Sequence, residues 1–189
     1  MRNWPRWGPR RQSKPPAGPS SRRGRLNMTN ANPPLLIRVD DLRGPEIVAM
    51  LEEHLEDMHA SSPEDSCHAL DLEGLRRPEV TFWTAWEGPV LAGCGAIKRL
   101  DATHAEIKSM RTGSAFRGRG IGSQLLAHIL DEARRRGYRR VSLETGAGDF
   151  FAPARALYEK FGFVACPPFD GYLEDPHSRF YTKELTPGD

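Results

Sequence analysis

The chain has 189 residues, with 27 lysines and arginines against 25 aspartates and glutamates, which gives a formal net charge of +2. The near-balance conceals a split, because residues 1–27 hold eight basic residues and no acidic one, so the remainder is acidic overall. No apolar run approaches the roughly 18 residues of a membrane-spanning helix. The three cysteines are far apart and form no C-x-x-C pair. A disulfide framework and a cysteine zinc site are therefore not expected, and we predict a cytoplasmic protein.

Residues 1–34 are predicted to be a disordered basic tail, because they hold seven prolines and too little apolar surface to offset the chain entropy. Arginines around Trp4 and Trp7 could neutralise and stack on nucleic acid. A transit peptide or an export signal would be a second use, but the amphipathic helix and the hydrophobic stretch that these signals need are missing. We favour a tail that contributes little, with Met28 as the biological start.

Residues 35–189 are predicted to be one globular domain with a proper core. Alternating or β-rich runs predict strands at Leu35–Val39, Val80–Trp86, Val90–Ile97, Ala105–Arg111, Val141–Thr145, Phe163–Ala165 and Phe180–Thr182. Helices are predicted at Glu46–His59, Ile121–Ala133 and Ala154–Phe161, and Ala69–Leu75 is a short segment that could form one more. In the fourth strand, simple alternation places Ile107 on one face and Glu106, Lys108 and Met110 on the other. A mixed sheet flanked by helices, in the α/β (α+β) class, is the expected architecture.

A glycine-rich turn, residues 117–122 (RGRGIG), lies between a predicted strand and a predicted helix. Such a turn binds phosphate oxygens, since glycines allow close backbone approach and the first N–H groups of the helix point at the anion. Two familiar phosphate motifs do not fit. No lysine follows Gly122 as a P-loop requires, and a dinucleotide fingerprint beginning at Gly118 would have Ser123 at its last position.

The spacing R-x-x-G-x-G of Arg117, Gly120 and Gly122 resembles motif A of the Gcn5-related N-acetyltransferases, the GNAT superfamily. Residues 156–163 (ALYEKFGF) are similar to the helix and strand that follow in that family, at the matching distance. Fragments 68–71 (HALD) and 168–172 (PFDGY) resemble a branch of small bacterial GNAT proteins of poorly defined substrate. One departure is Phe151, which stands where many members have an asparagine near the cofactor. The resemblance implies a GNAT fold with a mixed, mostly antiparallel sheet of six to seven strands and about four helices.

The same resemblance implies an acetyl-CoA-dependent N-acetyltransferase without a metal. Backbone amides of Met110, Arg111 and Thr112 would pair with the pantetheine arm, and the amide of Met110 would stabilise the oxyanion. The pyrophosphate would be held by Arg117, Gly118, Arg119, Gly120, Ile121, Gly122 and Ser123.

Acetyl transfer to an amine needs a base for the ammonium group and an acid for the leaving thiolate. Tyr158 matches the family tyrosine that serves as general acid, and packing against the sheet is its alternative role. Glu106 matches the position of the general base in histone-acetylating members. A glutamate on an alternating strand can also simply face water, and many GNAT enzymes use a water chain instead.

The acceptor is expected to be a small-molecule amine or a protein amine, and the resemblance implies a site between the first helices and the C-terminal loop. Acidic residues there would favour a cationic amine or form an ordinary solvated helix face, namely Glu52, Glu53, Glu56, Asp57, Glu64 and Asp65. His54 and His59 are five residues apart and make a poor metal pair. The alternative function is a non-catalytic CoA-sensing or nucleic-acid-associated protein that uses the basic tail, but the acidic remainder argues against nucleic acid. Dimers are common in the family, so a homodimer is compatible with the resemblance.

Overall fold

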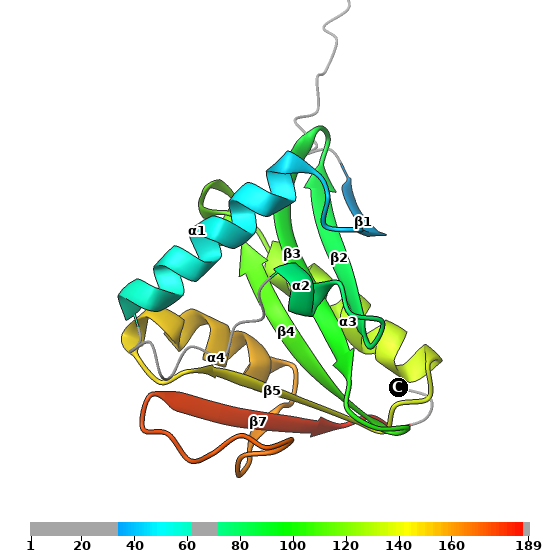
Figure 1. Cartoon of the computed structure of the whole chain (residues 1–189), viewed down its shortest axis with the longest axis vertical. Helices are drawn as coiled ribbons and strands as arrows, with labels where there is room; N and C mark the ends of the chain where they lie inside the picture. The colour runs from blue at the N-terminus through cyan, green and yellow to red at the C-terminus, as the bar shows by residue number, and fades with distance from the viewer. Residues whose placement is uncertain (1–33, 62–71, 187–189) are drawn as a thin grey trace, which may run out of the picture. The chain divides into compact units, whose positions relative to one another are not determined.

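A computed structural model of the chain describes residues 34–61 and 72–186, and these form a sheet with helices on both faces (Figure 1). The predictions for the N-terminal tail, for Glu64 and Asp65 and for residues 68–71 lie outside the described residues. The sheet has seven strands in the order β1-β2-β3-β4-β5-β7-β6. They are β1 Leu35–Val39, β2 Val80–Glu87, β3 Val90–Arg99, β4 His104–Thr112, β5 Arg140–Gly146, β6 Val164–Ala165 and β7 Ser178–Glu184. Each neighbouring pair is antiparallel except β4 with β5, so the predicted mixed, mostly antiparallel sheet is confirmed.

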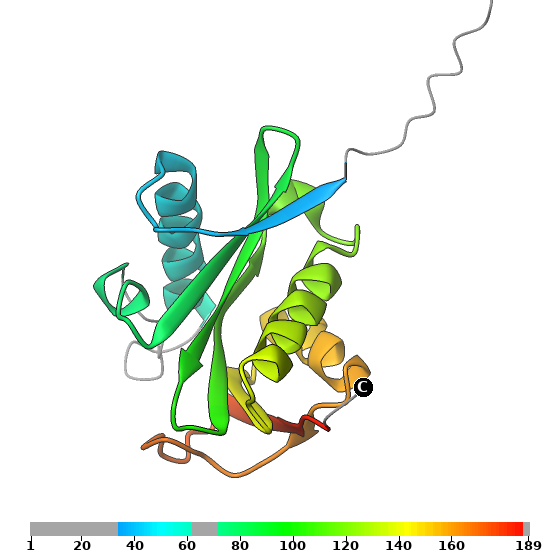
Figure 2. The same ribbon diagram turned by 90° about the vertical axis from the view of Figure 1, so that its right-hand side faces the viewer.

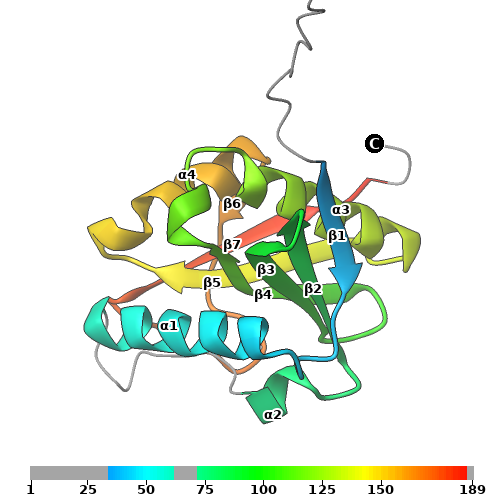
Figure 3. The same cartoon turned by 90° about the horizontal axis from the view of Figure 1, so that it is seen from above.

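Four α-helices in the described residues cover the sheet, as predicted: α1 Pro45–Ser61, α2 Leu72–Leu75, α3 Ile121–Arg135 and α4 Ala152–Lys160. Helices α1 and α2 lie on one face and α3 and α4 on the other (Figures 2 and 3). Short 3-10 turns at Ser114–Phe116 (η2) and Asp149–Phe151 (η3) precede α3 and α4. Among the helices of the described ranges, none has the length and apolar character that crossing a membrane requires.

The hydrophobic core has one layer on each face of the sheet. On the α3 face, the buried helix residues are Leu125, Leu126, Ile129, Leu130 and Ala133. Their spacing of three and four residues puts them on one stripe, which packs against β3, β4 and β5. On the other face, Ile47, Met50 and Leu51 of α1 pack against Phe82 of β2. Burial on both faces explains why the central strand β3 is almost continuously apolar.

An irregularity in β4 changes which of its side chains share a face. Ala96 pairs with Lys108 and Cys94 with Arg111, so β4 contains an extra residue, and Ser109 has a positive φ of 52°. Such a β-bulge reverses the alternation beyond it. A Cβ added to Gly95 would lie 2.6 Å from Met110 Sδ and 2.9 Å from Cδ1 of Ile129 on α3, which places Met110 on the α3 face. The expectation that Met110 shares a face with Glu106 and Lys108 is therefore wrong.

Candidate active site

The parallel strands β4 and β5 separate, and a cavity of about 640 Å³ opens where they part. They pair only from His104 with Arg140 to Ile107 with Leu143, while β5 continues alongside β7 to Gly146. The cavity is lined by residues of both strands and also by His54 and Met58 of α1 and Leu157 and Tyr158 of α4. Because α1 and α4 cover opposite faces, this cavity reaches both sides of the sheet.

Most of the predicted site residues line this one cavity: Met110, Arg111, Thr112, Arg117, Gly118, Gly120, Ile121, Gly122, Ser123 and Tyr158. Met110 and Tyr158 are 48 positions apart in sequence, and both line the cavity that opens between β4 and β5. Glu106 and Arg119 are predicted site residues that do not line it.

The glycine-rich turn presents the start of α3 to the cavity. Gly118 and Gly120 have φ values of 74° and 81°, in the left-handed region that favours glycine. Gly120 is the N-cap of α3 and provides no side-chain cap, so N–H groups of the first helical turn remain available to an anion. Arg117 is exposed and has no ion-pair partner among residues 34–61 and 72–186. The turn therefore combines backbone donors with an uncommitted positive charge.

Arg119 is directed away from this turn. Its Nη2 lies 2.5 Å and 2.8 Å from the two carboxylate oxygens of Glu87, at the end of β2, and its guanidinium stacks 5.1 Å from the ring centroid of Phe116. The positive charge predicted for the anion site is therefore neutralised by Glu87, 32 residues away in sequence.

The backbone of β4 divides the three predicted amides between its two edges. The N–H of Gly113 donates to Ala92 O of β3 at 2.9 Å. Because amide groups along an extended strand point alternately to its two edges, the N–H of Arg111 also faces β3. Those of Met110 and Thr112 face the open edge, where β5 has separated. These two amides are thus placed to donate into the cavity.

Tyr158 is buried on α4, where its ring packs edge-on against Phe163 at 5.8 Å between centroids. Burial raises the pKa of Tyr158, and the negative charge of Glu144 raises it further. The phenol therefore keeps its proton throughout the neutral range. A protonated hydroxyl at the cavity wall is the form that a general acid requires.

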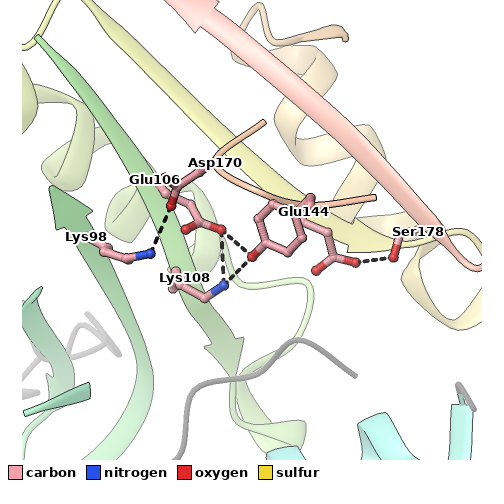
Figure 4. A network of polar contacts seen from close by, with 7 residues as sticks. Lys98, Glu106, Lys108, Glu144, Asp170 and Ser178 are labelled. Carbon is pink, nitrogen blue, oxygen red and sulfur yellow. Dashed lines mark hydrogen bonds and ion pairs between the residues drawn. The ribbon is translucent and has the colours of Figure 1, made fainter. Parts of the chain in front are cut away.

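Glu106 lies on β4 with a side chain that is only 1% exposed, so the alternative that it faces water is wrong. Its Oε1 accepts a hydrogen bond from Tyr172 Oη at 2.7 Å and lies 3.0 Å from Lys108 Nζ (Figure 4). Lys108 Nζ also donates to Tyr172 Oη at 2.7 Å. Burial and the Glu106 charge raise the pKa of Tyr172, so this hydroxyl stays protonated. The Glu106 carboxylate is thus satisfied by two neighbours.

Two acidic residues of α1 are paired with an arginine of β4. Glu53 and Asp57 lie 2.6 Å and 2.9 Å from the guanidinium of Arg111, whose side chain is 5% exposed. Glu52 and Glu56 are exposed. His54 Nδ1 is 3.3 Å from Arg111 Nη1, and burial together with the Arg111 charge lowers the pKa of His54 to about 4. At neutral pH the imidazole is therefore uncharged.

Several residues that line the cavity were not predicted from the sequence. Glu144 on β5 and Lys108 on β4 line the cavity directly after the last β4–β5 pair. Glu144 Oε1 accepts a hydrogen bond from Ser178 Oγ at 2.7 Å. Parallel pairing of the two predicted strands would have placed Lys108 and Glu144 side by side. Phe151, the departure from the family pattern, also lines the cavity, and its ring lies against the backbone of Gly146.

Comparisons with known proteins agree with this arrangement of fold and site. Residues 47–163 match the model of the acetyltransferase (GNAT) family. The chain is 56% identical to YsnE of Bacillus subtilis over 149 residues, and this match covers 79% of this chain and 99% of YsnE. It is 48% identical to YedL of Escherichia coli, over 79% and 94% of the two chains. Both relatives are described as uncharacterized N-acetyltransferases.

A relative with a more specific name is the IAA acetyltransferase of Azospirillum brasilense, 38% identical over 74% of this chain and 89% of that protein. Among solved structures, an acyl-CoA N-acyltransferase-like protein of Klebsiella pneumoniae is 25% identical with a TM-score of 0.65, over 80% of this chain and 98% of that one. The fold and the site thus define an acetyltransferase. The chain belongs to the GNAT acetyltransferase family, and the predicted enzyme class, an N-acetyltransferase, is confirmed.

Proposed function

We propose that the protein transfers the acetyl group of acetyl-CoA to a primary amine by direct attack in a ternary complex. The observation that carries this proposal is the cavity that reaches both faces of the sheet between β4 and β5. One substrate can enter beside α3 and α4 and the other beside α1, so that the reacting groups meet between the strands. Such positioning is a main source of rate in a two-substrate reaction.

Acetyl-CoA is the co-substrate that we assign to this cavity. A Cβ added at Gly118 or Gly120 would meet no atom within 4 Å, so these glycines have open space beside them. We assign the pyrophosphate to this turn, the start of α3 and Arg117, and the pantetheine arm to the amides of Met110 and Thr112. Two proteins of the same fold have been solved with acetyl-CoA bound: yncA of Salmonella typhimurium, 20% identical with a TM-score of 0.59, and an Elizabethkingia anophelis protein, 20% identical with a TM-score of 0.56.

The chemistry assigned to this chain's residues follows the order of the reaction. The deprotonated amine attacks the thioester carbonyl, and the amide of Met110 donates to the developing oxyanion. As the carbon–sulfur bond breaks, Tyr158 gives its proton to the thiolate of CoA. A base role for Glu106 stays a prediction from the resemblance, and in the structure its carboxylate contacts Lys108 and Tyr172.

The acceptor is proposed to enter on the α1 side, where His54, Met58 and Lys108 line the cavity. A small-molecule amine and a protein amine both fit this assignment. The homodimer and the cytoplasmic location stay predictions. No feature of residues 34–61 and 72–186 favours the alternative of a passive nucleic-acid-associated protein.

Calorimetric titration of the full chain with acetyl-CoA tests whether the co-substrate binds. A thiol-release screen across amines, amino acids and lysine peptides tests whether the acetyl group is transferred to an amine. We expect saturable binding and amine-dependent release of CoA. Desulfo-CoA, which keeps the phosphates and the pantetheine arm but has no thioester, is the matched control, and it should bind without turnover. Absence of acetyl-CoA binding would contradict the proposal.

A further inference from the structure

The extra residue in β4 gives two basic side chains the same face of the sheet. Lys108 and Arg111 are three positions apart, so on a regular strand they would point to opposite faces. Ile107 packs in the core layer of α3, which puts Lys108 on the α1 face. The bulge at Ser109 reverses the alternation, and Arg111 contacts α1 as well. Both basic residues line the cavity, so the bulge gathers two positive charges at its α1 end.

Each of these cations is paired with acidic residues that do not line the cavity. Lys108 Nζ lies 3.0 Å from Glu106 Oε1 (Figure 4). Arg111 Nη2 and Nη1 lie 2.6 Å from Glu53 Oε1 and 2.9 Å from Asp57 Oδ2. None of the three acidic partners is among the described residues that line the cavity. In each ion pair it is therefore the positive member that lines the cavity.

Lys108 keeps a hydrogen-bond donor for a ligand. An ammonium group has three N–H donors, and those of Lys108 reach Glu106 Oε1 at 3.0 Å and Tyr172 Oη at 2.7 Å. Within residues 34–61 and 72–186, the third N–H has no hydrogen-bond partner. The Lys108 side chain is only 8% exposed, so little water competes for this donor. A charged donor that is held in place and poorly hydrated is suited to bind a carboxylate.

The other titratable residues that line the cavity leave its α1 end positive. In the described part of the chain, Arg117 and Glu144 are the remaining charged residues of the lining, so three basic residues stand against one acidic residue. Arg117 is assigned to the pyrophosphate. Burial and the Arg111 charge lower the pKa of His54 to about 4, so its imidazole is uncharged at neutral pH. An anionic group on the acceptor is therefore favoured beside Lys108.

We propose that the acceptor is an amino acid, a small molecule that carries a carboxylate together with its amine, and that Lys108 binds this carboxylate. This inference rests on the proposed function. Lys108 is the first residue of β4 after the last pair of that strand with β5. Met110, whose amide is assigned to the oxyanion, lies two residues further along β4, so one small molecule can place its carboxylate at Lys108 and its amine at the thioester. Arg111 adds a second positive charge at the same end. The carboxylate is unchanged in the product, an N-acetylated amino acid.

Matched pairs of substrates test the inference on the wild-type chain. Each pair is an amino acid and the amine that lacks only its carboxylate, such as phenylalanine with phenethylamine and β-alanine with ethylamine. Thiol release from acetyl-CoA gives kcat/KM for each member. We expect a preference for the amino acid of at least about 30-fold, because the amine leaves a buried charged donor without its partner. Equal use of both members, or a preference for the amine or for a lysine peptide with blocked ends, would overturn the inference.

Lys108→Gln and Lys98→Gln form a matched pair of variants. Lys98 of β3 pairs with Asp170 at 3.0 Å, and Lys108 donates to Tyr172, so both lysines hold the segment 166–177 between β6 and β7. Only Lys108 lines the cavity. We expect Lys108→Gln to lower kcat/KM for the amino acid by about 10- to 100-fold and to leave that for the amine within about threefold. Lys98→Gln should keep the wild-type preference within about twofold, and Lys108→Arg, which retains the charge, should keep most of it.

The outcomes separate this inference from the proposed function. Retention of the full preference in Lys108→Gln would overturn the inference, and so would an equal loss in Lys98→Gln, because the effect would then come from the position of segment 166–177. The wild-type comparison decides the question even if Lys108→Gln does not fold. Turnover of amines without a preference for a carboxylate would remove the inference and leave the proposed function standing. If the wild-type chain binds acetyl-CoA but releases no thiol with any amine or amino acid, the proposed function itself fails.

Discussion

Gly120 and Gly137 stand at the two ends of α3 and offer a matched pair for testing the anion site. Their φ values are 81° and 82°, and a Cβ added to either would meet no atom within 4 Å. Alanine at either position is therefore strained but not obstructed, and the left-handed conformation costs about 1–2 kcal/mol for a residue with a Cβ. The two substitutions should destabilise the fold equally, although only Gly120 lines the cavity.

The two variants should separate in their affinity for acetyl-CoA. A loss of about 1 kcal/mol lowers Tm by about 2–4 °C in a domain of this size, and we expect a similar fall for both. In Gly120→Ala the new methyl group stands beside the first N–H groups of α3, where a phosphate must approach. We expect its Kd for acetyl-CoA to rise at least about tenfold, which corresponds to about 1.4 kcal/mol, while Gly137→Ala stays within about twofold of wild type.

Isothermal titration calorimetry below the Tm of both variants measures the difference directly. Equal Kd values for the two variants would refute the assignment of the pyrophosphate to this turn. If both variants lost affinity for acetyl-CoA equally, the substitutions would act through a general effect on α3. If both kept the wild-type affinity, the phosphates would bind elsewhere.

Three further predictions follow from single contacts in the site. Tyr158→Phe should lower kcat by about 100-fold with the Kd for acetyl-CoA unchanged, and an unchanged kcat would remove Tyr158 from the mechanism. Arg117→Ala should weaken acetyl-CoA binding more than Arg119→Ala, because Arg119 already pairs with Glu87, and titration calorimetry of the two variants would show the reverse order if the assignment is mistaken. Because the pKa of His54 is lowered from 6.5 to about 4, the unfolded chain binds a proton between these pH values that the native chain does not. The free energy of unfolding should therefore fall as the pH falls through this range, and His54→Gln should flatten the fall in urea denaturation; equal slopes would contradict the buried, neutral imidazole.

The elements and the glycine-rich turn could be predicted from the sequence because their signals are local. The apolar spacing from Ile121 to Ala133 predicted α3, and the glycines before it predicted its exposed N-terminus. The pattern of residues 156–163 predicted Tyr158 on a helix, which is α4 in the structure. Each of these features depends on neighbours within a few positions along the chain.

The remaining features depend on partners distant in sequence. The bulge at Ser109 reverses the side of Met110, and no pattern within β4 signals an extra residue. Arg119 is directed to Glu87 by the β2–β3 hairpin, which lies beside the glycine-rich turn only in the folded chain.

The contacts of Glu106 and Glu144 also depend on partners distant in sequence. Glu106 is occupied by Tyr172, 66 residues later, and this contact cannot be read from an alternating strand. Glu144 is oriented by Ser178 of β7, 34 residues later. Its place beside Lys108 follows from the parallel register of β4 and β5, which the predicted strands leave open.

Two-substrate steady-state kinetics with acetyl-CoA and an active amine test most directly whether acetyl transfer occurs in a ternary complex. Direct attack predicts double-reciprocal lines that intersect, together with an unchanged protein mass after incubation with acetyl-CoA alone. Parallel lines with an acetylated protein would contradict the account, because they would show that the acetyl group passes through a residue of the enzyme.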